Sequence, residues 1–99
     1  MSRIPYEERV KTYTNALVAF GEDNQCFVAI EELSEAQKEI CKILRGEENL
    51  EHLAEEIADA TIMLEQIRLI FGINDLTNEW IDIKVKRLDE SMRKKVRPK

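Results

Sequence analysis

The three glycines of this 99-residue chain each follow a segment whose apolar residues recur every three or four positions. This spacing places apolar side chains on one face of an α-helix. Glycine suits the left-handed conformation in which many helices end, so Gly21, Gly46 and Gly72 predict boundaries between helices. Pro5 suits the first turn of a helix. We expect an all-α, four-helix, bundle-like domain with helices over about residues 5–20, 24–45, 49–71 and 75–94.

Each predicted helix carries an apolar face that is expected to form the core. The second helix should start after Asp23 or Asn24 as its cap. Its expected buried residues are Phe27, Ile30, Leu33, Ile40, Cys41 and Leu44. The fourth helix has heptad-like spacing in Ile81, Val85, Leu88 and Met92.

The third helix, with Asn49 as its expected cap, is apolar over a wider arc than one neighbour can cover. A first stripe runs from Leu50 to Leu64, and a second stripe beside it runs from Ala60 to Phe71. This helix should therefore lie either at the centre of a bundle or at an interface between subunits.

Length and charge limit the class of protein. We expect one helical domain over residues 1–92, followed by a basic, solvated and mobile tail over residues 93–99. The net charge of −5 argues against a nucleic-acid partner. No apolar run reaches the ~20 residues of a membrane span, and residues 1–6 do not resemble a secretory signal. The two cysteines would lie about 22 Å apart on one helix, as free thiols. A cytoplasmic protein is expected.

An acidic pattern occurs twice, as EELSE at 31–35 and as EEIAD at 55–59. Within each copy two carboxylates stand three residues apart and project from one side of their helix. These four candidate ligands are Glu32, Glu35, Glu56 and Asp59. If the helices pack face to face, each pair at about 6 Å repels by roughly 3 kcal/mol at an effective dielectric of 20. A divalent cation would turn that repulsion into binding energy, and hard oxygen ligands favour magnesium or manganese.

Other readings of these residues stay open. The acids are equally compatible with the surface of amphipathic helices. Lys84 and Arg87 on the fourth helix could balance phosphate charge or simply be solvated cations. His52 fits an exposed first-turn residue or a catalytic base, and Glu65 is expected to be solvated.

The order Glu-x-x-Glu and then Glu-x-x-Asp, in an all-helical chain of this size, resembles the MazG-like nucleoside triphosphate pyrophosphohydrolases. The similarity spans roughly residues 20 to 90 and includes AIEELSE at 29–35, the Arg45-Gly46 turn and KVKR at 84–87. It implies Mg²⁺-dependent, or Mn²⁺-dependent, hydrolysis of a nucleoside or deoxynucleoside triphosphate to the monophosphate and pyrophosphate.

The resemblance also implies roles for particular residues. Glu32, Glu35, Glu56 and Asp59 would be the metal ligands and catalytic acids. One of them, or Glu39, would orient or deprotonate the attacking water. Lys84 and Arg87 would bind the phosphates. Because family members form dimers or tetramers, the resemblance also implies a homodimer or homotetramer, which agrees with the wide apolar face of the third helix.

Two alternatives are kept. One is an enzyme similar to the phosphoribosyl-ATP pyrophosphohydrolase of histidine biosynthesis, which uses such acids on a related scaffold. The other is a non-catalytic helical module that binds a partner protein through the wide apolar face of the third helix.

The base pocket that the resemblance implies is harder to predict. Four aromatic residues could stack on a base or belong to the core: Tyr13, Phe20, Phe27 and Trp80. Gln25 could contact the base or sugar, or bond to solvent at a helix start. The preferred nucleobase is not predictable from these residues.

Overall fold

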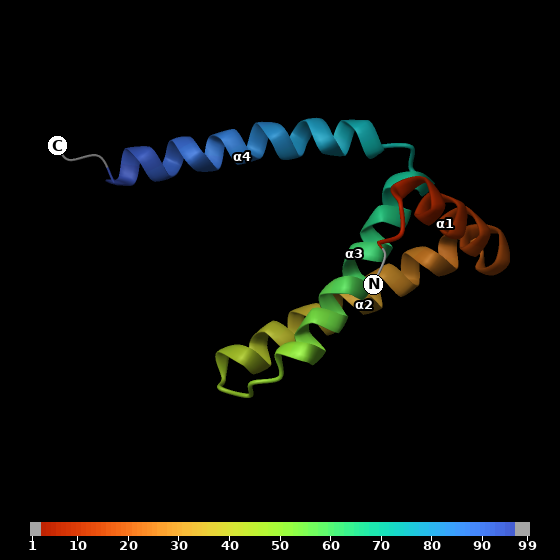
Figure 1. Ribbon diagram of the computed structural model, residues 1–99, viewed down its shortest axis with the longest axis horizontal. Helices are drawn as coiled ribbons and strands as arrows, with labels where there is room; N and C mark the ends of the chain where they lie inside the picture. Colours follow the sequence, from red (N-terminus) through yellow and green to blue (C-terminus); the bar gives the residue numbers. More distant parts are fainter. Residues whose placement is uncertain (1–2, 97–99) are drawn as a thin grey trace.

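The structure is a computed structural model that describes residues 3–96, and it contains α-helices and no strand over that range (Figure 1). The all-α prediction is confirmed, with boundaries within two residues of those expected. The four helices are α1 (Tyr6–Phe20), α2 (Glu22–Leu44), α3 (Leu50–Ile70) and α4 (Asn74–Val96).

Two of the helix boundaries show how the turns are made. Gly21 adopts a φ of 90°, and its N–H donates to the carbonyl oxygen of Leu17 at 2.9 Å, which ends α1. The next residue already belongs to α2, so the prediction that Asp23 or Asn24 caps this helix is wrong. At α3 the predicted cap is confirmed, since the Asn49 side chain accepts a hydrogen bond from the backbone N–H of His52 at 3.0 Å.

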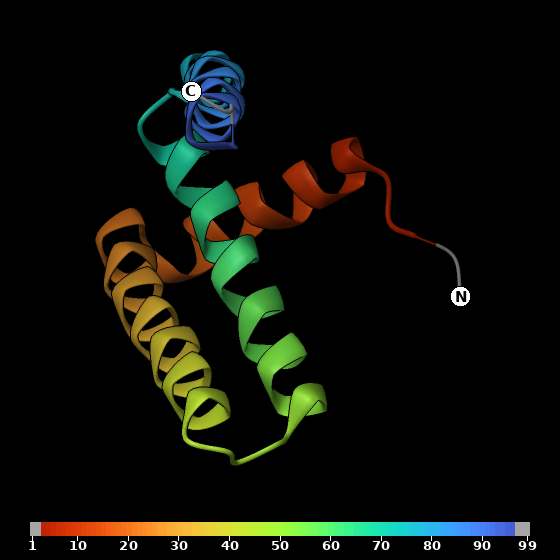
Figure 2. The same ribbon diagram turned by 90° about the vertical axis from the view of Figure 1, so that its left-hand side faces the viewer.

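The centre of the molecule is the antiparallel pair of α2 and α3, which lie side by side (Figure 2). Small residues line their contact: Ala29, Ala36 and Ala60 are 3%, 7% and 7% exposed. Short side chains allow the two backbones to approach closely, so every group on this face is brought near the opposite helix. Gln25 and Gln66 form a buried hydrogen bond of 2.7 Å across the pair.

The predicted core of α2 was wrong. The six residues expected to be buried are exposed, from Leu33 at 41% to Leu44 at 81%. The buried residues of α2 are instead Gln25, Ala29, Ala36 and Glu39. The helix turns its small and acidic face toward α3, and the apolar residues expected in the core are exposed.

Helix α1 crosses one end of the α2–α3 pair. Tyr13 is its buried residue, at 5% exposed, and its hydroxyl donates a hydrogen bond to Glu65 of α3. Arg9 forms an ion pair of 2.6 Å with the same carboxylate. The expectation that Glu65 is solvated is therefore wrong, since this residue joins α1 to α3.

Helix α4 contacts α3 near its start, where Arg68 donates a hydrogen bond of 3.0 Å to Asn78. It then diverges from the α2–α3 pair as a projecting arm (Figure 1). The radius of gyration is 17.1 Å, against about 13 Å for a compact domain of 100 residues. Residues 93–96 of the predicted tail belong to α4, where Arg93 pairs with Asp89 at 3.1 Å, and residues 97–99 lie outside the described residues.

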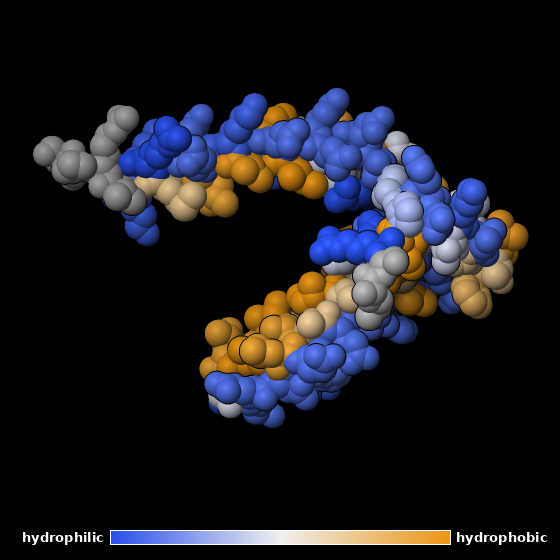
Figure 3. All heavy atoms as spheres, in the orientation of Figure 1, coloured by the Kyte–Doolittle hydropathy of each residue, from blue (hydrophilic) through white to orange (hydrophobic). Residues whose placement is uncertain are grey.

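Apolar side chains are spread over exposed faces of the molecule. Figure 3 shows hydrophobic residues on the side of α4 that faces the α2–α3 pair and on the neighbouring edge of that pair. Over residues 3–96 no large side chain is fully buried. None of the helices in this part of the chain combines the length and hydropathy needed to cross a membrane.

The alanine contact gives a direct test of the packing. Ala60→Leu should lower the free energy of unfolding by about 1–3 kcal/mol, because the larger side chain forces α2 and α3 apart. Ala58→Leu is the matched control, since Ala58 lies two residues away on an exposed face of α3. Urea unfolding followed by circular dichroism measures both changes. Equal stability of the two variants would contradict the close α2–α3 contact.

Candidate metal centre

Three of the four predicted acids converge between α2 and α3. Glu32 of α2 and Glu56 and Asp59 of α3 each offer a carboxylate oxygen, and these oxygens all lie within 4.8 Å of one another. Glu32 and Glu56 are half-buried, whereas Asp59 is exposed. The pairing of α2 with α3 through alanines places the three carboxylates on the same contact face.

The cluster concentrates negative charge, since three carboxylates lie close together and His52 is the basic group that contacts one of them, Glu56. Burial raises the pKa of Glu32, and the charges of Asp59, Glu56 and Glu35 raise it further. The stabilising contribution of the protonated Glu32 is thus present at acid pH and is lost as the pH rises through the raised pKa. Glu56 Oε2 is buried and has no hydrogen-bond partner within the described residues. Both observations fit a site built for a hard cation, which would supply the missing charge and coordination.

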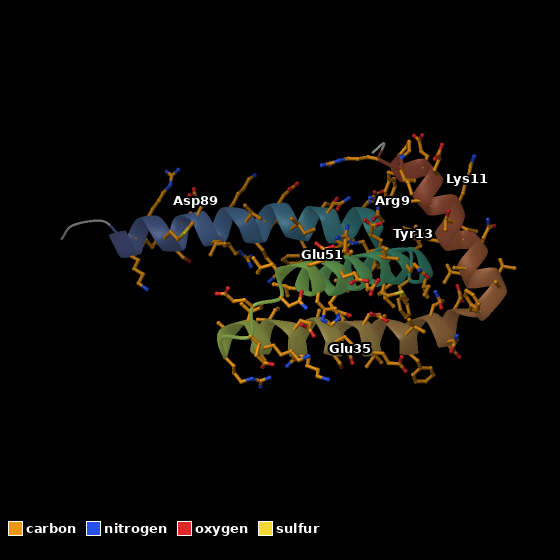
Figure 4. All side chains as sticks on the ribbon, turned by 60° about the horizontal axis from the view of Figure 1, so that its bottom comes forward. Arg9, Lys11, Tyr13, Glu35, Glu51 and Asp89 are labelled. Atoms are coloured by element: carbon orange, nitrogen blue, oxygen red, sulfur yellow. The ribbon has the colours of Figure 1, made fainter. Side chains whose placement is uncertain are left out.

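The structure does not bring the other predicted site residues into this cluster. Glu35 is exposed on the same helix (Figure 4) and acts on Glu32 through its charge alone. Lys84 and Arg87 lie on the arm of α4, where each stacks over the Trp80 ring at 5.8 and 5.9 Å. These cations therefore belong to a separate surface of the single chain.

A histidine lies beside the acidic cluster. His52 Nδ1 is 3.1 Å from Glu39 Oε1, and His52 Nε2 is 3.3 Å from Glu56 Oε1. The prediction of an exposed first-turn residue is confirmed, since His52 lies in the first turn of α3 and its side chain is 42% exposed. The prediction did not include its contacts with two carboxylates. The spacing of four residues between His52 and Glu56 is the sequence signal that would have predicted this contact.

Glu39 is almost completely buried, with its side chain 3% exposed. Burial raises the pKa of this carboxyl, but a hydrogen bond from Lys42 and the charge of His52 outweigh burial and hold the pKa below its usual range. Lys42 Nζ donates to Glu39 Oε1 at 3.2 Å. The carboxylate of Glu39 is therefore engaged by two basic groups, and it has little access to a water molecule.

The residues considered for a base pocket do not gather around the acids. Gln25 is 6% exposed and bonds to Gln66, so neither a solvent contact nor a nucleotide contact fits it. The Tyr13 hydroxyl is already used in its hydrogen bond to Glu65. Burial and this hydrogen bond raise the pKa of Tyr13 to about 12. Phe20 and Phe27 are 63% and 65% exposed on faces away from the carboxylate cluster.

This arrangement can hold a divalent ion on one side while leaving its other side open, because Asp59 is exposed and only three side chains converge. Such an open position is what a phosphate ligand of magnesium requires. A comparison with protein-family models, with curated proteins and with solved structures found no match to this chain.

The repulsion within the cluster predicts the effect of removing one charge. Glu32→Gln keeps the shape of the side chain, so it should raise the melting temperature without magnesium by several degrees at pH 7, since about 1 kcal/mol shifts a domain of this size by 4–8 °C. It should also reduce the further rise that magnesium produces in the wild type. Differential scanning fluorimetry with a magnesium titration measures both effects.

The control is Glu31→Gln, because Glu31 is the exposed neighbour of Glu32 on the same helix. It should melt like the wild type at every magnesium concentration. A lower melting temperature for Glu32→Gln without magnesium would contradict the repulsion, and an equal response of both variants to magnesium would contradict the ion site.

Proposed function

We propose that the chain is a magnesium-dependent hydrolase that converts a nucleoside or deoxynucleoside triphosphate to the monophosphate and pyrophosphate. The observation that carries this proposal is the meeting of Glu32, Glu56 and Asp59 within 4.8 Å, with a buried oxygen of Glu56 left unpartnered. Acids on the surface of amphipathic helices ordinarily point into solvent, because each partly desolvated charge costs free energy, whereas Glu32 and Glu56 are both half-buried in this cluster.

The residues divide the work in a simple way. Glu32, Glu56 and Asp59 would hold the metal ion, and manganese would be an acceptable substitute. Glu35, one turn from Glu32, adds negative charge near the site, since its charge raises the pKa of Glu32. A bound magnesium ion supplies Lewis-acid polarisation of the phosphate oxygens and lowers the pKa of a coordinated water. The exposed carboxylate of Asp59 is the acid best placed to orient an attacking water.

Further support comes from the order of the two acidic motifs, which resembles that of the MazG-like pyrophosphohydrolases. Cleavage between the α and β phosphates is the reaction that this resemblance implies. The two cysteines are free thiols, which fits a protein that works in the reducing cytoplasm, where nucleotides and magnesium are also found.

The activity can be tested with a panel of common and damaged nucleoside triphosphates, including phosphoribosyl-ATP, assayed with magnesium for pyrophosphate release. Glu56→Gln and Asp59→Asn should each reduce the rate by about 100-fold or more, as expected when charge stabilisation in the active site is lost. Glu55→Gln is the control, since Glu55 is exposed beside Glu56.

Pyrophosphate and monophosphate should appear in equal amounts. Release of orthophosphate instead would contradict cleavage between the α and β phosphates. Absence of any product, together with a melting temperature that does not respond to magnesium, would favour the non-catalytic interaction module.

We also propose that the chain works as a homo-oligomer whose smallest unit is a dimer. Val85, Leu88 and Met92 of α4 are 57%, 60% and 52% exposed, and the apolar face of α2, which points away from α3, is exposed to a similar degree. A stable interface buries about 800 Å² on each partner, and a 23-residue helix with an apolar stripe is long enough to contribute most of that area. A second copy offers the same apolar faces, so each chain can cover the other.

Assembly would also change the surroundings of the α4 cations. Because α4 diverges from the acids of its own chain, Lys84 and Arg87 have no phosphate to bind in an isolated copy. Packing of α4 against a second copy would bring its basic side chains toward an acidic cluster, where opposite charges attract. The proposed roles of these two residues thus depend on the assembly.

The apolar stripe of α4, formed by Val85, Leu88 and Met92, predicts which substitution should disrupt the oligomer. Val85→Glu should convert the oligomer to a monomer or unfold it, because a charge placed in an apolar interface loses its hydration. Lys86→Gln is the control, since it changes the net charge by the same amount on an exposed position next to Val85. Size-exclusion chromatography with light scattering gives the mass. A monomeric wild type at micromolar concentration would contradict the proposal.

A further inference from the structure

Glu39 is a buried carboxylate that the proposed reaction does not use. It lies on the α2 face that contacts α3, seven residues from Glu32, so the two side chains share one side of the helix two turns apart. A carboxylate that is 3% exposed destabilises a fold unless it is paired. The structure pairs it twice, with Lys42 of its own helix and with His52 of the opposite helix.

The contact with His52 leads directly to the acidic cluster. The imidazole ring stands between two carboxylates, with Nδ1 at 3.1 Å from Glu39 Oε1 and Nε2 at 3.3 Å from Glu56 Oε1. Glu56 Oε1 is thereby engaged, whereas Glu56 Oε2 is buried and unpartnered. The two oxygens of one carboxylate thus have different surroundings: Oε1 contacts His52, and Oε2 is enclosed without a hydrogen-bond partner.

His52 has one partner for its backbone and another for its ring. The backbone N–H of His52 is fixed by the Asn49 cap at 3.0 Å, which sets the start of α3. The buried Glu39 carboxylate then fixes the ring through Nδ1. A glutamate side chain has three rotatable bonds, so a fixed partner at one carboxylate oxygen reduces the entropy lost when the other oxygen binds a ligand.

We infer that His52, anchored by Glu39, is a positioning residue that holds the Glu56 carboxylate with its free oxygen turned toward the proposed ion. This inference rests on the proposed metal site and adds two residues to it, neither of which touches the ion. Because Glu39 is enclosed by Lys42 and His52, its role is to orient the histidine, and the assignment of Glu39 as a general base is not needed.

The test is the affinity of the full-length chain for Mn²⁺ alone, measured by electron paramagnetic resonance at one fixed pH. His52→Ala should weaken Mn²⁺ binding by about 10-fold, in the range found when a group that orients a metal ligand is removed. His52→Gln keeps a donor of similar reach and should recover part of the loss. Glu39→Gln should weaken binding as well, although Glu39 does not belong to the ligand cluster.

A double-variant cycle separates positioning from a general loss of stability. If Glu39 acts through His52, adding Glu39→Gln to His52→Ala should cause no further loss of affinity. Melting temperatures without metal identify variants that fail to fold. Glu51→Ala is the matched control, because Glu51 is exposed in the same first turn of α3, and it should bind Mn²⁺ like the wild type.

The outcomes separate the positioning role of His52 from the proposed metal site and its activity. If the wild type binds Mn²⁺ and hydrolyses a triphosphate while His52→Ala binds Mn²⁺ equally well or more tightly, the positioning role is overturned and the proposed function stands. Independent, additive losses from His52→Ala and Glu39→Gln would also overturn it. If the wild type binds no Mn²⁺, the metal site fails and the positioning role fails with it.

Discussion

The close contact between α2 and α3 is the interaction on which the rest of the structure depends. Alanines at the contact let the two backbones approach, and the same face of each helix carries carboxylates. Three acids are therefore pressed together in a partly desolvated space, where their mutual repulsion opposes the packing that creates it. A larger residue in place of Ala36 or Ala60 would separate the two helices. This would weaken the repulsion between the carboxylates, and it would also disrupt the acidic cluster.

The orientation of α2 costs free energy because it leaves apolar side chains of this helix exposed. With its small and acidic face toward α3, the helix leaves residues such as Phe27, Ile30 and Leu44 in solvent. The ordinary arrangement would bury these residues and expose the acids, since apolar burial is the dominant favourable term in folding. The reverse arrangement is physically reasonable for a chain whose apolar faces are covered by another copy.

Much of the fold was predictable because it depends on local rules. Apolar spacing and the positions of Gly21, Gly46 and Gly72 predicted four helices with boundaries close to the observed ones. The rotation of α2 was not predictable in this way. Hydrophobic periodicity identifies which residues share a face, but it does not say whether that face is covered by the same chain or by a partner.

The candidate site was predictable to a similar degree. The i, i+3 spacing found Glu56 and Asp59, and it found Glu32 together with Glu35, of which only Glu32 joins the cluster. Glu35 immediately precedes the buried Ala36, so it points about 100° away from the α2–α3 contact. The contact from Glu39 to His52 links separate helices, and no spacing rule within one helix reveals such a pair.

In a chain with so little buried apolar surface, folding is thermodynamically coupled to the proposed ion binding and to the proposed assembly. Over residues 3–96 the buried apolar residues are few and mostly small. A cation between Glu32 and Glu56 would remove repulsion across α2 and α3, and this would stabilise the helix pair whose outer faces would meet a second copy in the proposed oligomer. By linkage, assembly must then strengthen ion binding by the same free energy by which the ion strengthens assembly. The acidic cluster would thus report on the oligomeric state, because a site assembled from two helices is only as rigid as the contacts that hold those helices together.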